Sequence, residues 1–178
     1  MMVLVIGGSG SGKSLYAEDF VLSLSPGKKY YLATMRVCDG ESLRKVEKHR
    51  ELRQGKGFLT IEQPVEIHRA LEKMKAGDRT VLLECLSNLT ANEMFRGAEP
   101  EPEEAVAERI VDGIGRIRES VTHLVVVGNN VFEDGIRYEE TTMGYMRAMG
   151  PIHRRLAAMA DRVIEMEAGI PVVIKGDQ

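Results

Sequence analysis

An α/β fold, with a mostly parallel β-sheet covered by helices, is predicted by three features of the sequence. Short runs rich in β-branched residues alternate with longer segments of helical periodicity. The apolar runs show little polar alternation, which is typical of strands buried on both faces of a parallel sheet. A glycine-rich octapeptide follows the first apolar run directly. This βα order places ligands at the carboxyl ends of the strands.

Seven strands and six helices are expected along the chain. The strands are predicted at residues 3–6, 29–33, 58–61, 80–83, 123–127, 162–165 and 171–174. The helices are predicted at residues 13–24, 41–54, 64–75, 86–95, 103–119 and 142–160. The acidic, proline-containing stretch 97–102 is typical of a loop rather than a domain boundary, so we expect one domain over residues 1–178.

Composition excludes several classes of protein. A net charge of −3 gives no reason to expect a nucleic-acid partner. No apolar run approaches the length of a membrane span, and the short N-terminal run lacks a basic leader, so we expect neither a membrane anchor nor a signal peptide. Cys38 and Cys85 belong to no metal-binding pattern, which favours a reduced, cytoplasmic protein without structural zinc.

The octapeptide between the first predicted strand and helix matches the Walker A pattern G-x-x-x-x-G-K-[ST] at every fixed position. Its residues are Gly7, Gly8, Ser9, Gly10, Ser11, Gly12, Lys13 and Ser14. Glycines let successive backbone N–H groups turn toward a phosphate, and the following helix points its positive end at the same anion. Lys13 would reach the β- and γ-phosphates, and the Ser14 hydroxyl would hold Mg²⁺. The alternative is an ordinary Gly/Ser turn, but this context favours binding of a nucleoside triphosphate.

The predicted strand 80–83 ends in an acid, Glu84. In proteins with a Walker A loop this is the position of the Walker B acid, beside the Mg²⁺ and its waters. The alternative is a solvated strand terminus. With the loop in the same chain we favour the metal site, where Glu84 would act directly, through water or as a base.

The predicted helix 41–54 contains His49 among several cationic residues, including Arg50 and Arg53. One interpretation is a solvated helix with weak surface ion pairs. The other is a nucleophilic imidazole, which nearby positive charge keeps neutral and able to attack phosphorus. The local sequence leaves both open.

Further segments along nearly the whole chain carry a family resemblance. They are the opening MMVLVIGGSGSGKSLYAE, YLATM at 31–35, LRKVEKHRELR at 43–53, FLTIEQP at 58–64, VLLECLSNLTANEMF at 81–95, RLAAMAD at 155–161 and GIPVVIK at 169–175. In this order and spacing they resemble the adenosylcobinamide kinase/adenosylcobinamide-phosphate guanylyltransferase family of cobalamin biosynthesis. The Walker A loop alone indicates only an NTPase, whereas the later segments are much more specific.

The resemblance implies two reactions with GTP and ATP as substrates and Mg²⁺ as cofactor. A nucleoside triphosphate phosphorylates adenosylcobinamide, and GMP then passes from GTP through a histidine to adenosylcobinamide phosphate. The histidine is His49, with Lys13 and Glu84 as the other catalytic residues and Ser14 and Glu84 as the metal ligands. Beyond the loop, the nucleotide-site residues implied are Leu15, Thr34, Met35, Arg36, Arg50, Arg53, Glu62 and Glu84.

The resemblance also implies a fold related to RecA and a homotrimer with its nucleotide site near a subunit boundary. Two segments depart from the family pattern. At 128–138 an expected acid is Asn130 and an expected proline is missing, and a later Asn-Gln pair is represented by His153-Arg154 or Arg154-Arg155. These departures leave open that one activity is lost or its substrate shifted.

Two other functions remain as alternatives. One is a small-molecule kinase of the same loop class that transfers only the γ-phosphoryl group. The other is a non-enzymatic nucleotide-binding switch with a protein partner. Neither would need the His-Arg and Thr-Ile-Glu segments at 49–50 and 60–62.

Overall fold

The seven predicted strands are all present in a single sheet. A computed structural model describes residues 1–24, 27–36, 40, 44, 47, 53–132, 135–136 and 138–177. The strands are β1 (Met2–Gly7), β2 (Lys28–Ala33), β3 (Phe58–Glu62), β4 (Arg79–Glu84), β5 (His123–Asn129), β6 (Arg162–Glu167) and β7 (Ile170–Lys175). Each matches a predicted strand to within a few residues.

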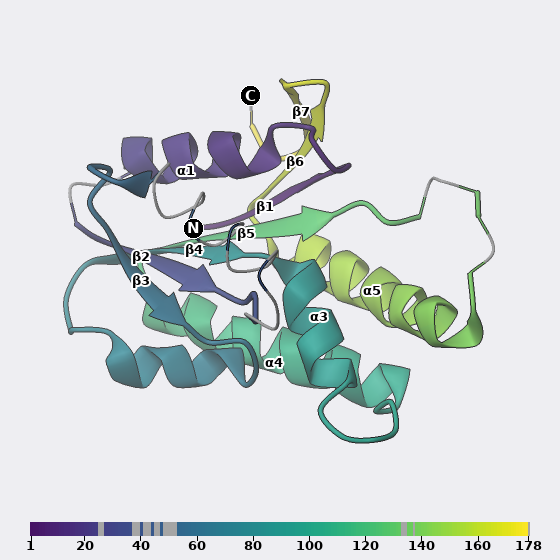
Figure 1. Cartoon of the computed structure of the whole chain (residues 1–178). Helices are drawn as coiled ribbons and strands as arrows, with labels where there is room; N and C mark the ends of the chain where they lie inside the picture. Colours follow the sequence, from purple (N-terminus) through teal and green to yellow (C-terminus); the bar gives the residue numbers. More distant parts are fainter. Residues whose placement is uncertain are drawn as a thin grey trace.

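The sheet has the strand order β3-β2-β4-β5-β1-β6-β7. Strands β1 to β6 run parallel, and β7 turns back to pair antiparallel with β6 at one edge (Figure 1). The first strand therefore lies in the interior, between two strands from the second half of the chain. The prediction of a mostly parallel α/β sheet is confirmed.

Four predicted helices occur as α-helices close to their expected bounds. They are α1 (Lys13–Leu24), α3 (Leu86–Met94), α4 (Glu103–Ser120) and α5 (Glu140–Met159). The predicted helix 41–54 lies largely outside the described residues. In this region the backbone is described as helical at residues 40, 44, 47 and 53.

The predicted helix 64–75 is instead a shorter 3₁₀ helix, η1 (Ile67–Lys73). The residue before it, Glu66, has a left-handed backbone with φ 48°, so the preceding residues cannot continue the helix. Its N–H is also taken by the carboxylate of Glu93 on α3, at 2.6 Å. Tertiary contacts therefore shorten the helix that the sequence predicts.

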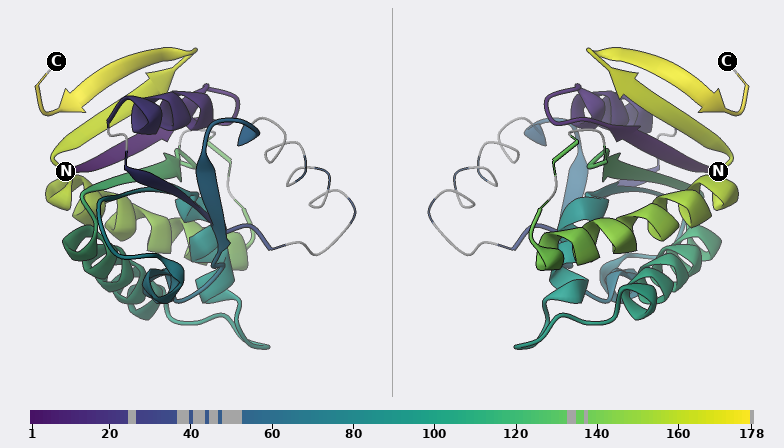
Figure 2. Two further views of the ribbon diagram at one scale, coloured as in Figure 1. Left: turned by 90° about the vertical axis from the view of Figure 1, so that its left-hand side faces the viewer. Right: turned by 90° about the vertical axis from the view of Figure 1, so that its right-hand side faces the viewer.

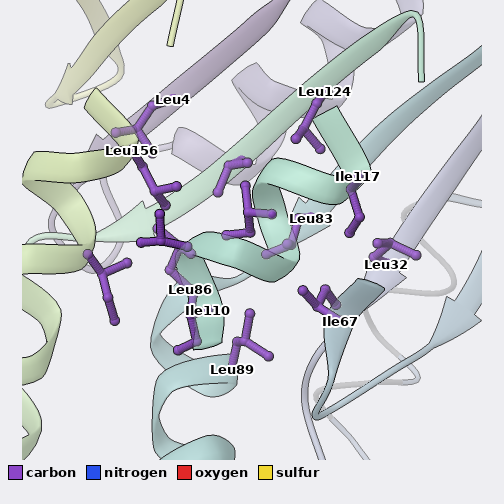
Figure 3. Packing of buried hydrophobic residues seen from close by; sticks show 14 of the residues in the cluster. Leu4, Leu32, Ile67, Leu83, Leu86, Leu89, Ile110, Ile117, Leu124 and Leu156 are labelled. Atoms are coloured by element: carbon purple, nitrogen blue, oxygen red, sulfur yellow. The ribbon is translucent and has the colours of Figure 1, made fainter. Parts of the chain in front are cut away.

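The helices cover the two faces of the sheet unequally. Helix α1 lies on one face, whereas η1, α3, α4 and α5 cover the other (Figures 1 and 2). The larger core lies under the second group, where leucines and isoleucines of the strands and helices interdigitate (Figure 3). Because both faces are covered, the strands are apolar on both sides, which explains their continuous hydrophobic runs.

The parallel strands bring five chain segments together at their carboxyl edge. The loop after β1, the ends of β2, β3 and β4, and the start of the segment after β5 all meet there. Ligands of open α/β sheets bind at this edge. No helix of the described residues is long and apolar enough to cross a membrane.

Candidate nucleotide site

The glycines of the loop between β1 and α1 are required by its backbone. Gly10 and Gly12 have φ values of 74° and 87°, which side chains strongly disfavour. A Cβ on Gly7 would lie 2.7 Å from both the Met166 carbonyl oxygen and Ser11 Oγ. The loop therefore has the tight, inward-turning conformation that the Walker A pattern predicts.

Lys13 is buried at the beginning of α1 and curls back over the loop. Its ammonium group donates a 2.9 Å hydrogen bond to the Gly8 carbonyl oxygen. This position holds the charge directly beside the loop, where the phosphates of a nucleotide would lie.

Ser14, on the next position of α1, reaches the end of β4. Its hydroxyl donates a 2.8 Å hydrogen bond to Oε1 of Glu84. The other carboxylate oxygen, Oε2, is buried without a hydrogen-bond partner among the described residues. Burial raises the pKa of Glu84 to about 7, although the Ser14 hydrogen bond and the Lys13 charge pull it down. The structure therefore brings the first turn of α1 and this acid together, while their shared metal site stays a prediction.

Thr34 holds the backbone at the end of β4. The Glu84–Cys85 peptide bond is cis. The buried Thr34 hydroxyl accepts a 2.8 Å hydrogen bond from the Cys85 N–H and lies 2.8 Å from the Cys85 carbonyl oxygen. Its backbone N–H donates to the Glu84 carbonyl oxygen at 3.0 Å. Thr34 is therefore buried and fixes the backbone that carries Glu84.

Glu62 and Glu84 flank the end of β2 on the same side of the sheet. Ala33 is the register partner of both residues, so the three side chains share a face. Met35 and Arg36 follow directly on β2, half-buried and exposed respectively. The sheet therefore brings the predicted residues 34–36, 62 and 84 to one place.

Arg53 is buried with its guanidinium group over the ring of Tyr31, 3.5 Å from the ring centroid. Two guanidinium nitrogens, Nε and NH1, are buried without a hydrogen-bond partner in the described part of the chain. Burial, and secondly the negative charge of Glu84, raise the pKa of Tyr31. The cation is thus held in place by stacking on the ring.

Three residues around this site had no predicted role: Glu18, Tyr31 and Lys56. Glu18 is 5 % exposed, and its Oε2 forms an ion pair with Lys56 Nζ at 2.7 Å. Glu18 follows Ser14 by four positions on α1, so helical spacing places both on the same face. That spacing was the available signal, whereas the contacts of Tyr31 and Lys56 depend on the folded sheet.

A second group of contacts, also unforeseen, holds the ends of β2 and β3 from the α3 side. The side-chain amide of Asn92 donates to the carbonyl oxygens of Thr34 at 2.7 Å and Pro64 at 3.1 Å. The neighbouring Glu93, almost fully buried, accepts from the Glu66 N–H and pairs with Arg109 at 3.0 Å. Helix α3 therefore ties the two loops together.

Two predicted site residues, His49 and Arg50, lie outside the described residues. Leu15 is described, in the first turn of α1, with a side chain that is 60 % exposed.

Sequence comparisons match nearly the whole chain. The model of the family "Cobinamide kinase / cobinamide phosphate guanyltransferase" matches residues 3–174. The Bifunctional adenosylcobalamin biosynthesis protein CobU of Salmonella typhimurium is 30 % identical over 184 residues, covering 98 % of this chain and all of that protein. The Bifunctional adenosylcobalamin biosynthesis protein CobP of Pseudomonas aeruginosa is 27 % identical, with 99 % of each chain covered.

Solved structures with a similar fold are more distant in sequence. The ATPase domain of G40P aligns with a TM-score of 0.54 at 9 % identity, covering 98 % of this chain and 76 % of that one. The KaiC-like protein PH0186 from Pyrococcus horikoshii aligns with a TM-score of 0.56 at 13 % identity, covering 99 % and 80 %. These likenesses show a fold shared with P-loop nucleotide-binding proteins.

Proposed function

The chain belongs to the cobinamide kinase / cobinamide phosphate guanyltransferase family, and we propose that it catalyses two successive transfers on adenosylcobinamide. A nucleoside triphosphate first phosphorylates the corrinoid hydroxyl. GTP then supplies GMP to adenosylcobinamide phosphate, which gives adenosylcobinamide-GDP. The observation that supports this best is the family match over residues 3–174, together with a buried Lys13, Ser14 and Glu84 around a Walker A loop.

In the first transfer, the substrate hydroxyl oxygen attacks the γ-phosphorus. A new P–O bond forms, the bond to the bridging β–γ oxygen breaks, and the nucleoside diphosphate leaves. Glu84, which lies beside the Ser14 hydroxyl at the end of β4, would act on the hydroxyl proton through water or as a base. Lys13 and the loop N–H groups stabilise the charge on the leaving phosphates.

In the second transfer, His49 acts as a covalent nucleophile. Its neutral nitrogen attacks the α-phosphorus of GTP, a P–N bond forms, and pyrophosphate leaves. A phosphate oxygen of adenosylcobinamide phosphate then attacks the same phosphorus, the P–N bond breaks, and His49 is free again. The intermediate divides one difficult displacement into two.

The residues at the Ser14 hydroxyl fit Mg²⁺. Ser14 Oγ and the buried, unpartnered Oε2 of Glu84 are hard oxygen ligands of the kind that Mg²⁺ prefers, and Mg²⁺ takes most remaining ligands from phosphates and water. When bound, the ion would neutralise charge on the polyphosphate.

Three wider features belong to the same proposal. Residues 1–178 form one domain, which is consistent with a sheet that takes strands from both ends of the chain. The protein works in the reducing cytoplasm, where the free thiol of Cys85 would stay unpaired.

It also assembles as a homotrimer. The edge strand β7 exposes three apolar side chains at alternate positions, Ile170, Val172 and Ile174, as an intersubunit surface would. Sedimentation of the wild type against Val172→Lys tests the assembly, and a wild-type monomer would refute it.

The covalent mechanism is tested by labelling. The protein is incubated with Mg²⁺ and GTP labelled at the α- or γ-phosphorus, then denatured. We expect an acid-labile, base-stable adduct from the α label only, as for a phosphoramidate, and none in His49→Ala. His68→Ala, a histidine on η1 across the sheet, is the matched control and should label normally. No α-label adduct with a fully active His49→Ala would refute the mechanism, and transfer of γ label to cobinamide tests the kinase step separately.

A further inference from the structure

The turn between β6 and β7 lies against the Walker A loop. The Gly169 N–H donates a 3.1 Å hydrogen bond to the Ser11 carbonyl oxygen, although the two residues are at opposite ends of the chain. The contact follows from the sheet, because β6 pairs with β1 and brings Met166 level with Gly7. A Cβ built on Gly12 would lie 3.6 Å from the Gly169 Cα, so the turn forms one wall of the loop.

This hydrogen bond fixes a group that would contact phosphate. In a planar trans peptide, the carbonyl oxygen of one residue and the N–H of the next point in opposite directions. Since the Ser11 carbonyl is held toward the turn, the Gly12 N–H points away from the turn. Asn130 acts in the same way from β5, because its N–H donates to the Gly7 carbonyl oxygen at 3.0 Å and so orients the Gly8 N–H.

The turn itself has a tight backbone conformation. Ala168 and Gly169 have φ values of 49° and 84°, the two consecutive left-handed residues of a tight two-residue hairpin. The Ser11 side chain gives the loop no comparable support, because its hydroxyl is buried without a hydrogen-bond partner among the described residues. The orientation of the Ser11–Gly12 peptide therefore depends on the turn.

We propose that Gly169 is a positioning residue for polyphosphate binding, acting through the Ser11 carbonyl to aim the Gly12 N–H at the phosphates. The inference rests on the nucleotide-binding part of the proposed function. It assigns to the C-terminal hairpin a role in substrate binding that is separate from any role of its exposed edge.

Substitutions at Gly169 can test this role because the space around the turn is open. No atom lies within 4 Å of a Cβ added at Gly169, so substitutions there act through the backbone angle rather than by collision. Gly169→Val places a β-branched residue at a left-handed φ and should displace the turn, whereas Gly169→Asn tolerates that conformation and should keep it. Gly77, with φ 115° and equally open space on the chain before β4, gives the control Gly77→Val.

The readout is the dissociation constant for magnesium tripolyphosphate, which tests the phosphate loop without the base. We expect Gly169→Val to weaken binding about tenfold, the scale of one lost hydrogen bond to a charged group, with Gly169→Asn and Gly77→Val close to wild type. Gly169→Ala, with milder strain, should fall between and replaces the valine variant if that does not fold.

Each outcome decides the proposal. Wild-type affinity in both Gly169→Val and Gly169→Ala would overturn it, and so would an equal loss in Gly77→Val. The proposed chemistry fails independently: normal tripolyphosphate binding without a His49 adduct would refute the guanylyl transfer and leave the role of Gly169 intact.

Discussion

The hydroxyl of Ser14 donates its hydrogen bond to the carboxyl group of Glu84, the last residue of the interior strand β4. The contact joins residues 70 positions apart and links the first turn of α1 to the sheet edge. The protonation of Glu84 depends on its burial and on its neighbours Ser14 and Lys13. The pH dependence of the protein's stability therefore reports on this site.

The first prediction concerns that pH dependence in the nucleotide-free protein. The pKa of Glu84 rises from 4.5 to about 7 on folding. Between these pH values the folded state keeps a proton that the unfolded state releases, so the free energy of unfolding falls as pH rises through this window. Glu84→Gln removes the effect. In EDTA, the stability of this variant relative to wild type should therefore rise from pH 5 to pH 8, by up to about 3 kcal/mol, and melting temperatures measured across this range should show the rise.

Ser14→Ala provides the control for this experiment. The Ser14 hydrogen bond lowers the pKa of Glu84, so its loss should move the midpoint of the pH dependence upward. A stability difference between Glu84→Gln and wild type that stays constant from pH 5 to pH 8 would contradict the assignment.

The second prediction concerns Asn92, which bridges the ends of β2 and β3. Asn92→Asp keeps the shape but cannot donate to the Thr34 and Pro64 carbonyl oxygens. We expect about 2 kcal/mol lower stability and weaker GTP binding, because residues 34–36 and 62 lose their common support. Tripolyphosphate binding should be unchanged, since the Walker A loop is not touched.

Asn88→Asp, one turn earlier on α3, makes the same change of charge and is the matched control. Equal losses of GTP and tripolyphosphate affinity in Asn92→Asp would show a general rather than a local effect. Isothermal titration of both ligands separates the two results.

The third prediction concerns the stacking of Arg53 on Tyr31. Tyr31→Leu removes the ring that holds the guanidinium and should weaken GTP binding about tenfold, whereas Tyr31→Phe keeps the ring and should bind normally. Fluorescence titration with a labelled guanine nucleotide measures both. Equal affinities of the two variants would show that Arg53 does not bind the nucleotide.

The fourth prediction concerns Lys175, which closes the carboxyl end of α5. Its ammonium group donates to the carbonyl oxygens of Ala157, Ala158 and Ala160 at 2.6 to 3.0 Å. Lys175→Met should cost about 1–2 kcal/mol, because these last carbonyls lose a cationic partner. Calorimetry should show a clear fall in melting temperature. Lys28→Met, which removes one 3.4 Å contact to Ala76, should change it little.

The sequence predicted the parts of the fold that depend on local pattern. The strand ending at Glu84 was visible because its apolar residues are continuous, and the Walker A loop because its glycines are dictated by backbone angles. The pairing of Ser14 with Glu84 followed from the usual layout of such loops. Residues 64–66 were misassigned to a helix because contacts from α3, distant in sequence, set their conformation.

The rest of the site depends on the register of the sheet. Tyr31 and Lys56 carry no local signal of a site, and Tyr31 meets Arg53 only after β2 has paired with β4. The contact of Gly169 with Ser11 requires β6 beside β1. Such positions come from long-range pairing, which single-residue preferences do not encode.

The interior place of β1 also sets an order of events during synthesis. The ribosome makes β1 and the Walker A loop before the other strands, and the two strands that flank β1 are made much later, at His123–Asn129 and Arg162–Glu167. A growing chain therefore carries the apolar strand β1 unpaired until these later strands are made, a period when such edges attract chaperones. A chain stalled before Arg162 should not retain nucleotide, so binding marks the moment at which the nascent protein is complete enough to fold.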